Sequence, residues 1–279
     1  LEPGQFAGIR GNSKCGSPCV GARGPDPRPT VMPPPVVMTI AGSDSGGGAG
    51  IQADLKTFAA HDTFGTCAIT CVTAQNPNVV AGIAPIDPEM VALQVRTVCS
   101  AFELRAIKTS MLFSAAIINA TADVLLSCGS IPLVIDPVMV ATSGARLLED
   151  DAVHALTTRM MPLARVVTPN VPEAEVLAGR PVVDHEAMRE AARRIAGQYG
   201  IACVVKGGHM RGEGIMDVLC DHDDVIEISG SRVPDAQTHG TGCMYSAALA
   251  AGLAHGDSLP DAVERAQSHV RGALAGQRP

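Results

Sequence analysis

From residue 36 onward, short apolar runs alternate with longer stretches in which apolar residues recur at helical spacing. Such runs are typical of buried strands, and such stretches of amphipathic helices. The predicted strands are Val36–Ala41, Thr66–Thr73, Ala106–Lys108, Leu133–Asp136, Arg165–Thr168 and Cys203–Lys206. The predicted helices are Gly50–Ala60, Pro88–Phe102, Ala115–Ser127, Asp150–Met161, Ala174–Ala178, a helix capped by Asp184, Thr241–Ala254 and Leu259–Ala275. This alternation predicts an α/β fold, with a mainly parallel sheet and helices on both faces.

Two further features refine this arrangement. The apolar runs Met216–Cys220 and Val225–Ile228 lie close together and predict a hairpin. Glycine and polar clusters follow the strands, at Gly42–Gly50, Gln75-Asn76, Asp136, Asn170 and Lys206–Gly208. Because ligands of such folds lie beyond the carboxyl ends of the strands, we expect the functional site at these clusters.

Residues 1–35 differ from the rest of the chain, with eight of its 20 prolines and six of its 29 glycines. A segment of this composition cannot bury enough apolar surface to offset the entropy lost on ordering. We therefore expect a disordered leader over 1–35, with Met32 or Met38 as an alternative start, and a single domain over 36–279.

Composition excludes some functions. The net charge is −7, and the chain has no Trp, two Tyr and five Phe. Nucleic-acid binding favours a basic face and stacking aromatics, and both are missing. The chain has no run of about 18 apolar residues, so no membrane span is predicted. Nine cysteines, an odd number scattered through apolar segments, indicate reduced thiols in the cytoplasm.

The stretch THGTGCM, Thr238 to Met244, combines a glycine-rich turn, a helix start and a cysteine. Unpaired N–H groups and the helix dipole suit such a turn to an anion, usually phosphate, and the same field favours ionisation of a thiol. The alternative is a helix start with a buried, inert cysteine, and the residues alone leave both interpretations open.

Two common nucleotide motifs are missing. The chain contains no G-x-x-x-x-G-K-[ST], which disfavours a P-loop NTPase. The run GSDSGGGAG fails the dinucleotide fingerprint, because Ile51 occupies the third glycine position when Gly46 and Gly48 are the first two. A hydride-transferring oxidoreductase therefore lacks its main motif.

Six segments resemble, in order, the hydroxymethylpyrimidine/phosphomethylpyrimidine kinases of thiamine biosynthesis, in the ribokinase-like superfamily. They are AGSDSGGGAGIQADLKTF, TAQN, DPVMVATSG, TPNVPEAE, VKGGH and HGTGCMYSAALA, and the likeness runs from about Val36 to Gly272. The resemblance implies a three-layer α/β/α sandwich and ATP-dependent phosphorylation of the pyrimidine's hydroxymethyl group, then of the monophosphate. It also implies Mg²⁺, with ATP as co-substrate, and a homodimer.

Within the matched region, the chain departs from the usual pattern of this family at three places. Its first loop reads DSGGGAG where many relatives have proline and serine after the aspartate. Thr109-Ser110 replaces a more usual pair of a small apolar residue and glycine, which reshapes the wall near Met111. Thr142 stands where relatives commonly carry lysine, which removes one possible phosphate contact.

The metal and nucleotide end is assigned to four residues. Asp136 ends a buried strand, and Asn170 and Glu173, three apart at a helix start, can converge on a Mg²⁺–water shell. The alternative is that Asn170 caps the helix and that the negative charge of Glu173 interacts favourably with the helix dipole. With the resemblance, we expect Asp136 and Glu173 to hold the metal, and Lys206 and Asn170 to bind ATP. For Lys206 the alternative is a surface lysine at the sheet edge.

At the substrate end, Gln75 offers a donor and an acceptor on one amide, and the matching glutamine of the family reads the pyrimidine. Asp54 is a weaker candidate that otherwise faces solvent on its helix, and Gly42 and Met111 are expected to line the ring.

For catalysis we expect Gly240, Thr241 and Gly242 to direct N–H groups at the transferring phosphoryl group. Cys243 stands where ribokinase relatives commonly place aspartate, so the resemblance implies that it is the general base. The helix dipole is expected to lower the pKa of its thiol from about 8.5 toward neutrality.

Two other functions stay open at this point. Related enzymes with the same cysteine-ended loop phosphorylate pyridoxine or pyridoxal, a similar hydroxymethyl heterocycle. A non-catalytic pyrimidine-binding regulatory module on the same fold is the alternative from a different class. Such a module would be expected to lose the glycine cradle or the acids, and both are present here.

Overall fold

The computed structural model describes residues 33–139, 148, 150–210, 214–234 and 236–276. The chain divides into two units, Leu1–Pro33 and Pro34–Pro279, and the fold below is that of the second unit. The leader predicted for residues 1–35 and the Thr142 position lie outside the described residues, apart from 33–35, so both stay predictions.

Within the described residues, nine strands form one sheet in the order β3-β2-β1-β4-β5-β6-β7-β8-β9. The strands are β1 Val36–Asp44, β2 Phe64–Asn76, β3 Val79–Pro85, β4 Leu104–Thr109, β5 Leu133–Ile135, β6 Val166–Val167, β7 Ala202–Val205, β8 Gly214–Asp221 and β9 Asp224–Ser231. The strands from β2 to β7 along this order pair in parallel, whereas β3, β8 and β9 are antiparallel to their neighbours. The predicted mainly parallel sheet and the predicted hairpin, now β8 and β9, are confirmed.

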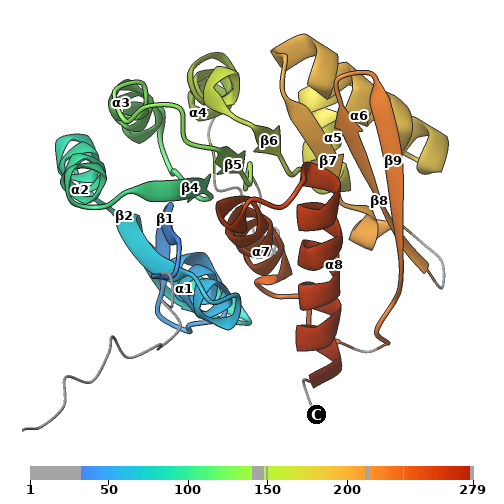
Figure 1. Cartoon of the computed structure of the whole chain (residues 1–279), viewed down its shortest axis with the longest axis horizontal. Helices are drawn as coiled ribbons and strands as arrows, with labels where there is room; N and C mark the ends of the chain where they lie inside the picture. Colours follow the sequence, from blue (N-terminus) through green and yellow to red (C-terminus); the bar gives the residue numbers. More distant parts are fainter. Residues whose placement is uncertain (1–32, 140–147, 149, 211–213, 235, 277–279) are drawn as a thin grey trace, which may run out of the picture. The chain divides into compact units, whose positions relative to one another are not determined.

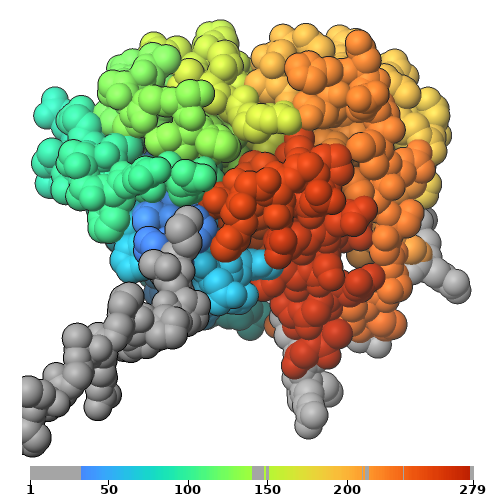
Figure 2. Space-filling model, viewed as in Figure 1, coloured from blue at the N-terminus to red at the C-terminus, as the bar shows by residue number. Residues whose placement is uncertain are grey.

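Helices cover both faces of this sheet (Figure 1). They are α1 Gly50–Ala60, α2 Pro88–Ala101, α3 Ala115–Leu125, α4 Asp150–Ala155, α5 Val171–Ala178, α6 His185–Tyr199, α7 Thr241–His255 and α8 Leu259–Gly276. One apolar cluster packs α2 to α6 against one face, and a second packs α1, α7 and α8 against the other. Figure 2 shows side chains of α1, α7 and α8 on the near face. The three-layer α/β/α arrangement is thus confirmed, and none of the described helices is long and apolar enough to cross a membrane.

Two elements differ from the prediction, each for a local reason. Strand β3 was not predicted. It lies at the sheet edge with nearly all its side chains exposed, so its run VVAGIAP shows no alternation of apolar and polar residues. The helix predicted over Asp150–Met161 is broken into α4, a π-helical turn at Leu156–Met160 and a 3₁₀ turn at Met161–Leu163. Pro162 lacks the N–H that an α-helix needs, and such a run commonly ends in these tighter or wider turns.

Candidate active site

A cavity of about 680 Å³ opens beyond the carboxyl ends of the parallel strands. The predicted site residues that line it come from elements far apart in the sequence: Gly42, Gln75, Met111, Asp136, Asn170, Glu173, Lys206, Gly240, Thr241, Gly242 and Cys243. The fold therefore brings together the residues that sequence analysis assigned to the metal, the nucleotide, the substrate and catalysis, with one exception.

The exception is Asp54, which does not line this cavity. Its side chain is fully buried on α1, where its carboxylate accepts hydrogen bonds from Lys108 Nζ at 2.8 and 2.9 Å and from Thr39 Oγ1 at 2.6 Å. The expectation that Asp54 touches the substrate is therefore wrong, and so is its alternative, a solvent-facing position. Sequence spacing placed Asp54 on a helix but could not show that a lysine of the sheet lies opposite.

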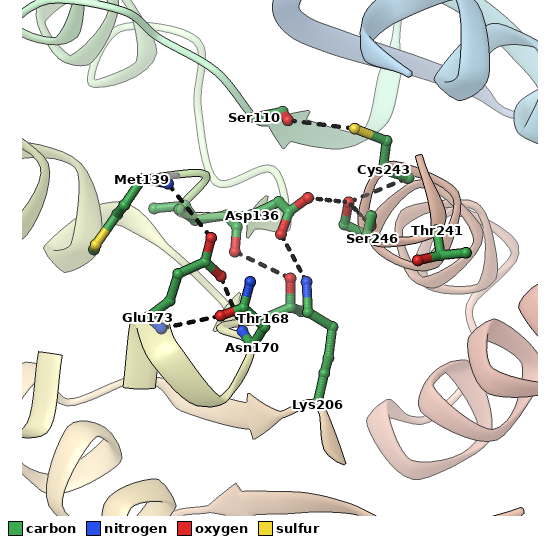
Figure 3. Close-up of polar contacts among 12 residues, drawn as sticks. Ser110, Asp136, Met139, Thr168, Asn170, Glu173, Lys206, Thr241, Cys243 and Ser246 are labelled. Carbon is green, nitrogen blue, oxygen red and sulfur yellow. Dashed lines mark hydrogen bonds and ion pairs between the residues drawn. The ribbon is translucent and has the colours of Figure 1, made fainter. Parts of the chain in front are cut away.

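An ion pair between Lys206 and Asp136 borders the cavity. Asp136 follows β5 and Lys206 follows β7, and Lys206 Nζ lies 2.9 Å from Asp136 Oδ1 (Figure 3). Ser246 Oγ donates to the other oxygen, Oδ2, at 3.3 Å. Burial alone would lower the pKa of Lys206, but the carboxylates of Asp136 and Glu173 raise it overall. Lys206 therefore stays cationic, as binding of a phosphate requires.

Asn170 and Glu173 form a reciprocal cap at the start of α5. Asn170 Oδ1 accepts from the Glu173 N–H at 3.0 Å, and Glu173 Oε2 accepts from the Asn170 N–H at 2.9 Å (Figure 3). Glu173 Oε1 also accepts from the Met139 N–H, at 3.4 Å. The structural role considered for this pair is thus present, and both side chains still border the cavity.

The carboxylates at the cavity fit a hard cation that keeps most of its bound water. Among the described residues, no group of three Asp, Glu, His or Cys side chains could hold a metal alone. Mg²⁺ is commonly bound by one or two carboxylates together with water and substrate phosphates. Asp136 and Glu173 are two such carboxylates, and burial raises the pKa of Glu173 while Lys206 opposes that rise. A nearby dication would favour the ionised form further.

The glycine-rich loop after β1 folds around Asp44. Its carboxylate accepts from the N–H groups of Gly46, Gly48 and Ala49 at 2.8, 3.1 and 2.9 Å. His239 Nε2 lies 3.5 Å from the same carboxylate, which agrees with a structural role for this histidine. Sequence analysis missed Asp44, although an aspartate before successive small residues is a known signal for such turns.

Two loops meet so closely that only glycine fits between them. Gly240 has a φ of +79°, and a Cβ there would lie 1.9 Å from Gly48 O. Gly50 has a φ of +57°, and a Cβ there would lie 2.3 Å from Gly42 O. The Gly240 contact seats the β1–α1 loop against the N-terminus of α7, whereas the Gly50 contact folds that loop back onto β1. As Gly240 is the N-cap, no side chain caps this helix end.

Cys243 lies in the first turn of α7 and lines the cavity, with its Sγ 3.8 Å from Ser110 Oγ (Figure 3). The expected lowering of its pKa is wrong. Burial raises the pKa of the thiol above its usual value, although Lys108 and the Gly50 N–H oppose the rise. Cys243 is half-buried at the cavity wall, and the protein atoms that displace water around its thiol disfavour the thiolate.

Gln75, which also lines the cavity, is held by its neighbours. Its Oε1 accepts from Thr73 Oγ1 at 3.1 Å, and Ser45 Oγ both accepts from the Gln75 N–H and donates to its carbonyl. Gly42 lies beside Met111, since a Cβ on the glycine would come within 3.6 Å of Met111 Sδ. An amide held by its neighbours, with the apolar Met111 lining the same cavity, suits a small polar heterocycle.

Comparison with known proteins agrees with this geometry. The family model described as phosphomethylpyrimidine kinase matches residues 44–278.

The chain belongs to the phosphomethylpyrimidine kinase family.

The predicted family is thus confirmed. The hydroxymethylpyrimidine/phosphomethylpyrimidine kinase of Rhizobium meliloti is 44% identical over 241 residues, covering 86% of this chain and 90% of the relative. The thiamine biosynthesis bifunctional protein ThiED of Geobacter sulfurreducens is 43% identical over 257 residues, 92% of this chain; the chain spans about half, 51%, of that longer relative.

The solved structures that resemble this chain include a phosphomethylpyrimidine kinase and a pyridoxal kinase. A phosphomethylpyrimidine kinase from Clostridium difficile superposes with a TM-score of 0.76 at 35% identity, covering 86% of this chain and 99% of that one. A pyridoxal kinase from Bacillus subtilis in an ADP complex superposes with a TM-score of 0.81 at 35% identity, covering 88% and 93%. Fold similarity therefore does not separate the two substrates.

Sequence analysis also missed a buried carboxylate in this kinase. Asp217, in the middle of β8, lines the cavity and accepts from the Gly207 N–H at 2.9 Å, from Tyr245 OH at 3.0 Å and from Gln267 Nε2 at 3.0 Å. These contacts tie the turn after Lys206 to α7 and α8. An aspartate inside the apolar run IMDVLC was the available signal, because such a residue needs buried partners.

Proposed function

We propose that this chain transfers the γ-phosphoryl group of ATP to the hydroxymethyl group of 4-amino-5-hydroxymethyl-2-methylpyrimidine, and then phosphorylates the monophosphate. One observation supports this proposal most strongly. A single cavity holds the Lys206–Asp136 pair, the uncapped N-terminus of α7 with Cys243, and the oriented amide of Gln75. Phosphoryl transfer needs positioning and charge neutralisation more than covalent chemistry, and these groups supply both.

Each group has a distinct task in this proposal. Lys206 and the N–H groups of Gly240 and Gly242 stabilise negative charge on the transferring phosphoryl group. The Thr241 N–H, also expected to do so, instead donates to Thr238 O at 3.2 Å. Asp136 and Glu173 would hold Mg²⁺, which would supply charge neutralisation at the phosphates, and Asn170 would lie beside the nucleotide. Gln75 pairs with the polar edge of the pyrimidine, while Gly42 and Met111 flank its ring.

Cys243 accepts the proton that the substrate hydroxyl sheds. Because burial raises the pKa of this thiol, only a minor fraction is thiolate at neutral pH. The proposal therefore includes a rate that increases with pH as this fraction grows.

A second candidate, phosphorylation of pyridoxal, is supported by the TM-score of 0.81 to the Bacillus subtilis pyridoxal kinase. The relatives named as hydroxymethylpyrimidine/phosphomethylpyrimidine kinases, with identities of 44% over 86% of the chain, favour the pyrimidine. We infer further that the kinase is a cytoplasmic homodimer, on the resemblance to the family alone, and light scattering measures its mass in solution.

The test is a comparison of substrates. ADP release by the purified full chain is measured with saturating ATP and Mg²⁺ against the pyrimidine, its monophosphate and pyridoxal, and each product is identified by mass. We expect the highest kcat/KM with the pyrimidine and a further phosphorylation of its monophosphate. A kcat/KM at least tenfold higher for pyridoxal would favour the second candidate. Ligand binding without ADP release from any substrate would indicate a non-catalytic module.

A further inference from the structure

One side of β4 faces the start of α7. Residues two apart on a strand share a face, so Ala106, Lys108 and the following Ser110 point the same way. Ala106 packs in the apolar cluster that contains α7, and Ser110 Oγ lies 3.8 Å from the Sγ of Cys243. Lys108 lies between them on this face, and its Nζ reaches Asp54 on α1, a helix that packs against α7.

Lys108 has no access to water, yet it carries a charge. Its Nζ donates to both carboxylate oxygens of Asp54, and Thr39 Oγ1 donates to Asp54 Oδ2 at 2.6 Å. Burial raises the pKa of Asp54, but every partner of its carboxylate is a donor, and the contacts with Lys108 and Thr39 oppose that rise and favour the ionised form. Burial alone would lower the pKa of Lys108, but Asp54 raises it overall, and so does a charge on Cys243. An ammonium is therefore fixed behind the cavity wall.

We propose that Lys108 and Asp54 are positioning residues that set the charge on Cys243, the ammonium favouring the thiolate and the carboxylate opposing it. The effect of this pair on catalysis rests on the proposed kinase function. Its effect on the charge of Cys243 does not. Neither residue touches the cavity, so the pair acts only through the thiol.

Four charged groups face Cys243 from the elements around it. Lys108 on β4 lowers the pKa of the thiol, whereas Asp54 on α1 and Asp136 after β5 raise it. Lys206 after β7 is the fourth, since a charge on Cys243 raises the pKa of that lysine. Lys206 and Asp136 border the cavity and change their surroundings when ligands bind. Lys108 and Asp54 do not, so they supply a constant field at Cys243.

The two buried residues have opposite signs, which separates this role from a purely structural one. Removing the ammonium in Lys108→Met leaves the Asp54 carboxylate near the thiol, so the thiolate becomes harder to form. Removing the carboxylate in Asp54→Asn leaves the ammonium without its partner, and a thiolate can then balance it. Loss of packing alone would not move the pKa in opposite directions.

The test measures the pH dependence of iodoacetamide alkylation at Cys243 in the full chain, followed by mass spectrometry of the peptide that contains it. We expect the midpoint to rise by about one pH unit or more in Lys108→Met and to fall by about one unit in Asp54→Asn. Thr39→Val is the matched control, because it removes a buried hydrogen bond to Asp54 without removing a charge. Its midpoint should stay within about 0.3 units of the wild type.

Midpoints that shift in the same direction in both variants, or not at all, would overturn the proposal. Breaking a buried ion pair is costly, so folding is checked by circular dichroism and thermal melting. If a single variant does not fold, Lys108→Met/Asp54→Leu replaces the pair with apolar side chains. A raised midpoint there supports the proposal, and an unchanged or lowered one overturns it. Because alkylation needs no substrate, a failed kinase assay would not affect this result.

Discussion

Two lysine–aspartate pairs lie near Cys243, and they differ in their access to the cavity. Lys206 and Asp136 have side chains 13% and 2% exposed and line the cavity, whereas the side chains of Lys108 and Asp54 are both fully buried. The Nζ–carboxylate distances are nearly equal, at 2.9 and 2.8 Å. The same ion-pair chemistry can thus bind a ligand or support a neighbouring residue, and its position relative to the cavity decides which.

The largest expected effect comes from the residue that both pairs influence. Cys243→Ala should lower kcat about 10²–10⁴-fold, the contribution typical of a general base, with the KM for ATP little changed. Steady-state kinetics with the pyrimidine measures both constants. Cys243→Asp, which restores an acid–base group, is the matched variant and should recover part of the loss. Normal turnover by Cys243→Ala would show that the cysteine only packs at the helix start. The two ion pairs would then have no catalytic thiol to influence.

Gln75 also lines the cavity, but its hydrogen bonds go to Thr73 and Ser45, so its replacement should leave both ion pairs intact. Gln75→Leu keeps the size of the side chain but leaves the polar edge of the substrate unpaired. We expect a cost of about 1–3 kcal/mol, which is roughly a 5- to 150-fold higher KM for the pyrimidine. The KM for ATP should change little. Equal damage to both constants would point to a folding defect.

The pH dependence of the rate sharpens the comparison further. Burial raises the pKa of Cys243, so its thiolate fraction is small at neutral pH and grows as the pH rises toward that pKa. We expect kcat to increase from pH 7 to pH 9, by at most about tenfold per unit. The increase should vanish in Cys243→Ala. A rate that falls over this range would contradict a base with a raised pKa.

The smallest effect concerns residues outside both pairs. Removing residues 1–35 should leave kcat and KM within a factor of about two, since a leader rich in proline and glycine buries little apolar surface. The truncated and full chains are compared in the same ADP-release assay and by the yield of soluble protein. Collapse of either would show that the leader packs against the domain.

Much of the fold followed from local signals in the sequence. The alternation of apolar runs with helical patterns located the parallel strands, and Asp184 caps α6 as predicted. Strand β3 escaped because an exposed edge strand has no buried face to pattern its side chains. The break at Leu156 was missed because apolar spacing continues through it, while the backbone changes its hydrogen bonding before Pro162.

The residues that line the cavity were predictable where they follow strands. The roles of residues that depend on the depth of burial were not. Asp136 and Lys206 end strands and are followed by proline or glycine, which marked them as ligand-facing. Lys108 also ends an apolar run, but nothing in AIKTSML shows that Asp54, 54 residues earlier, lies opposite. The raised pKa of Cys243 has the same origin, because burial depends on the packing of several elements and not on the helix start alone.

The difference between the two pairs is tested most directly by nucleotide binding. Calorimetry with a non-hydrolysable ATP analogue and Mg²⁺ compares Lys206→Met with Lys108→Met/Asp54→Leu, each against the wild type. We predict that Lys206→Met weakens binding at least about tenfold, because a charge-assisted contact to phosphate is lost. The double variant should bind within a factor of about two of the wild type. Equal losses in both variants, or unchanged binding by Lys206→Met, would contradict the distinct roles of the open and the buried pair.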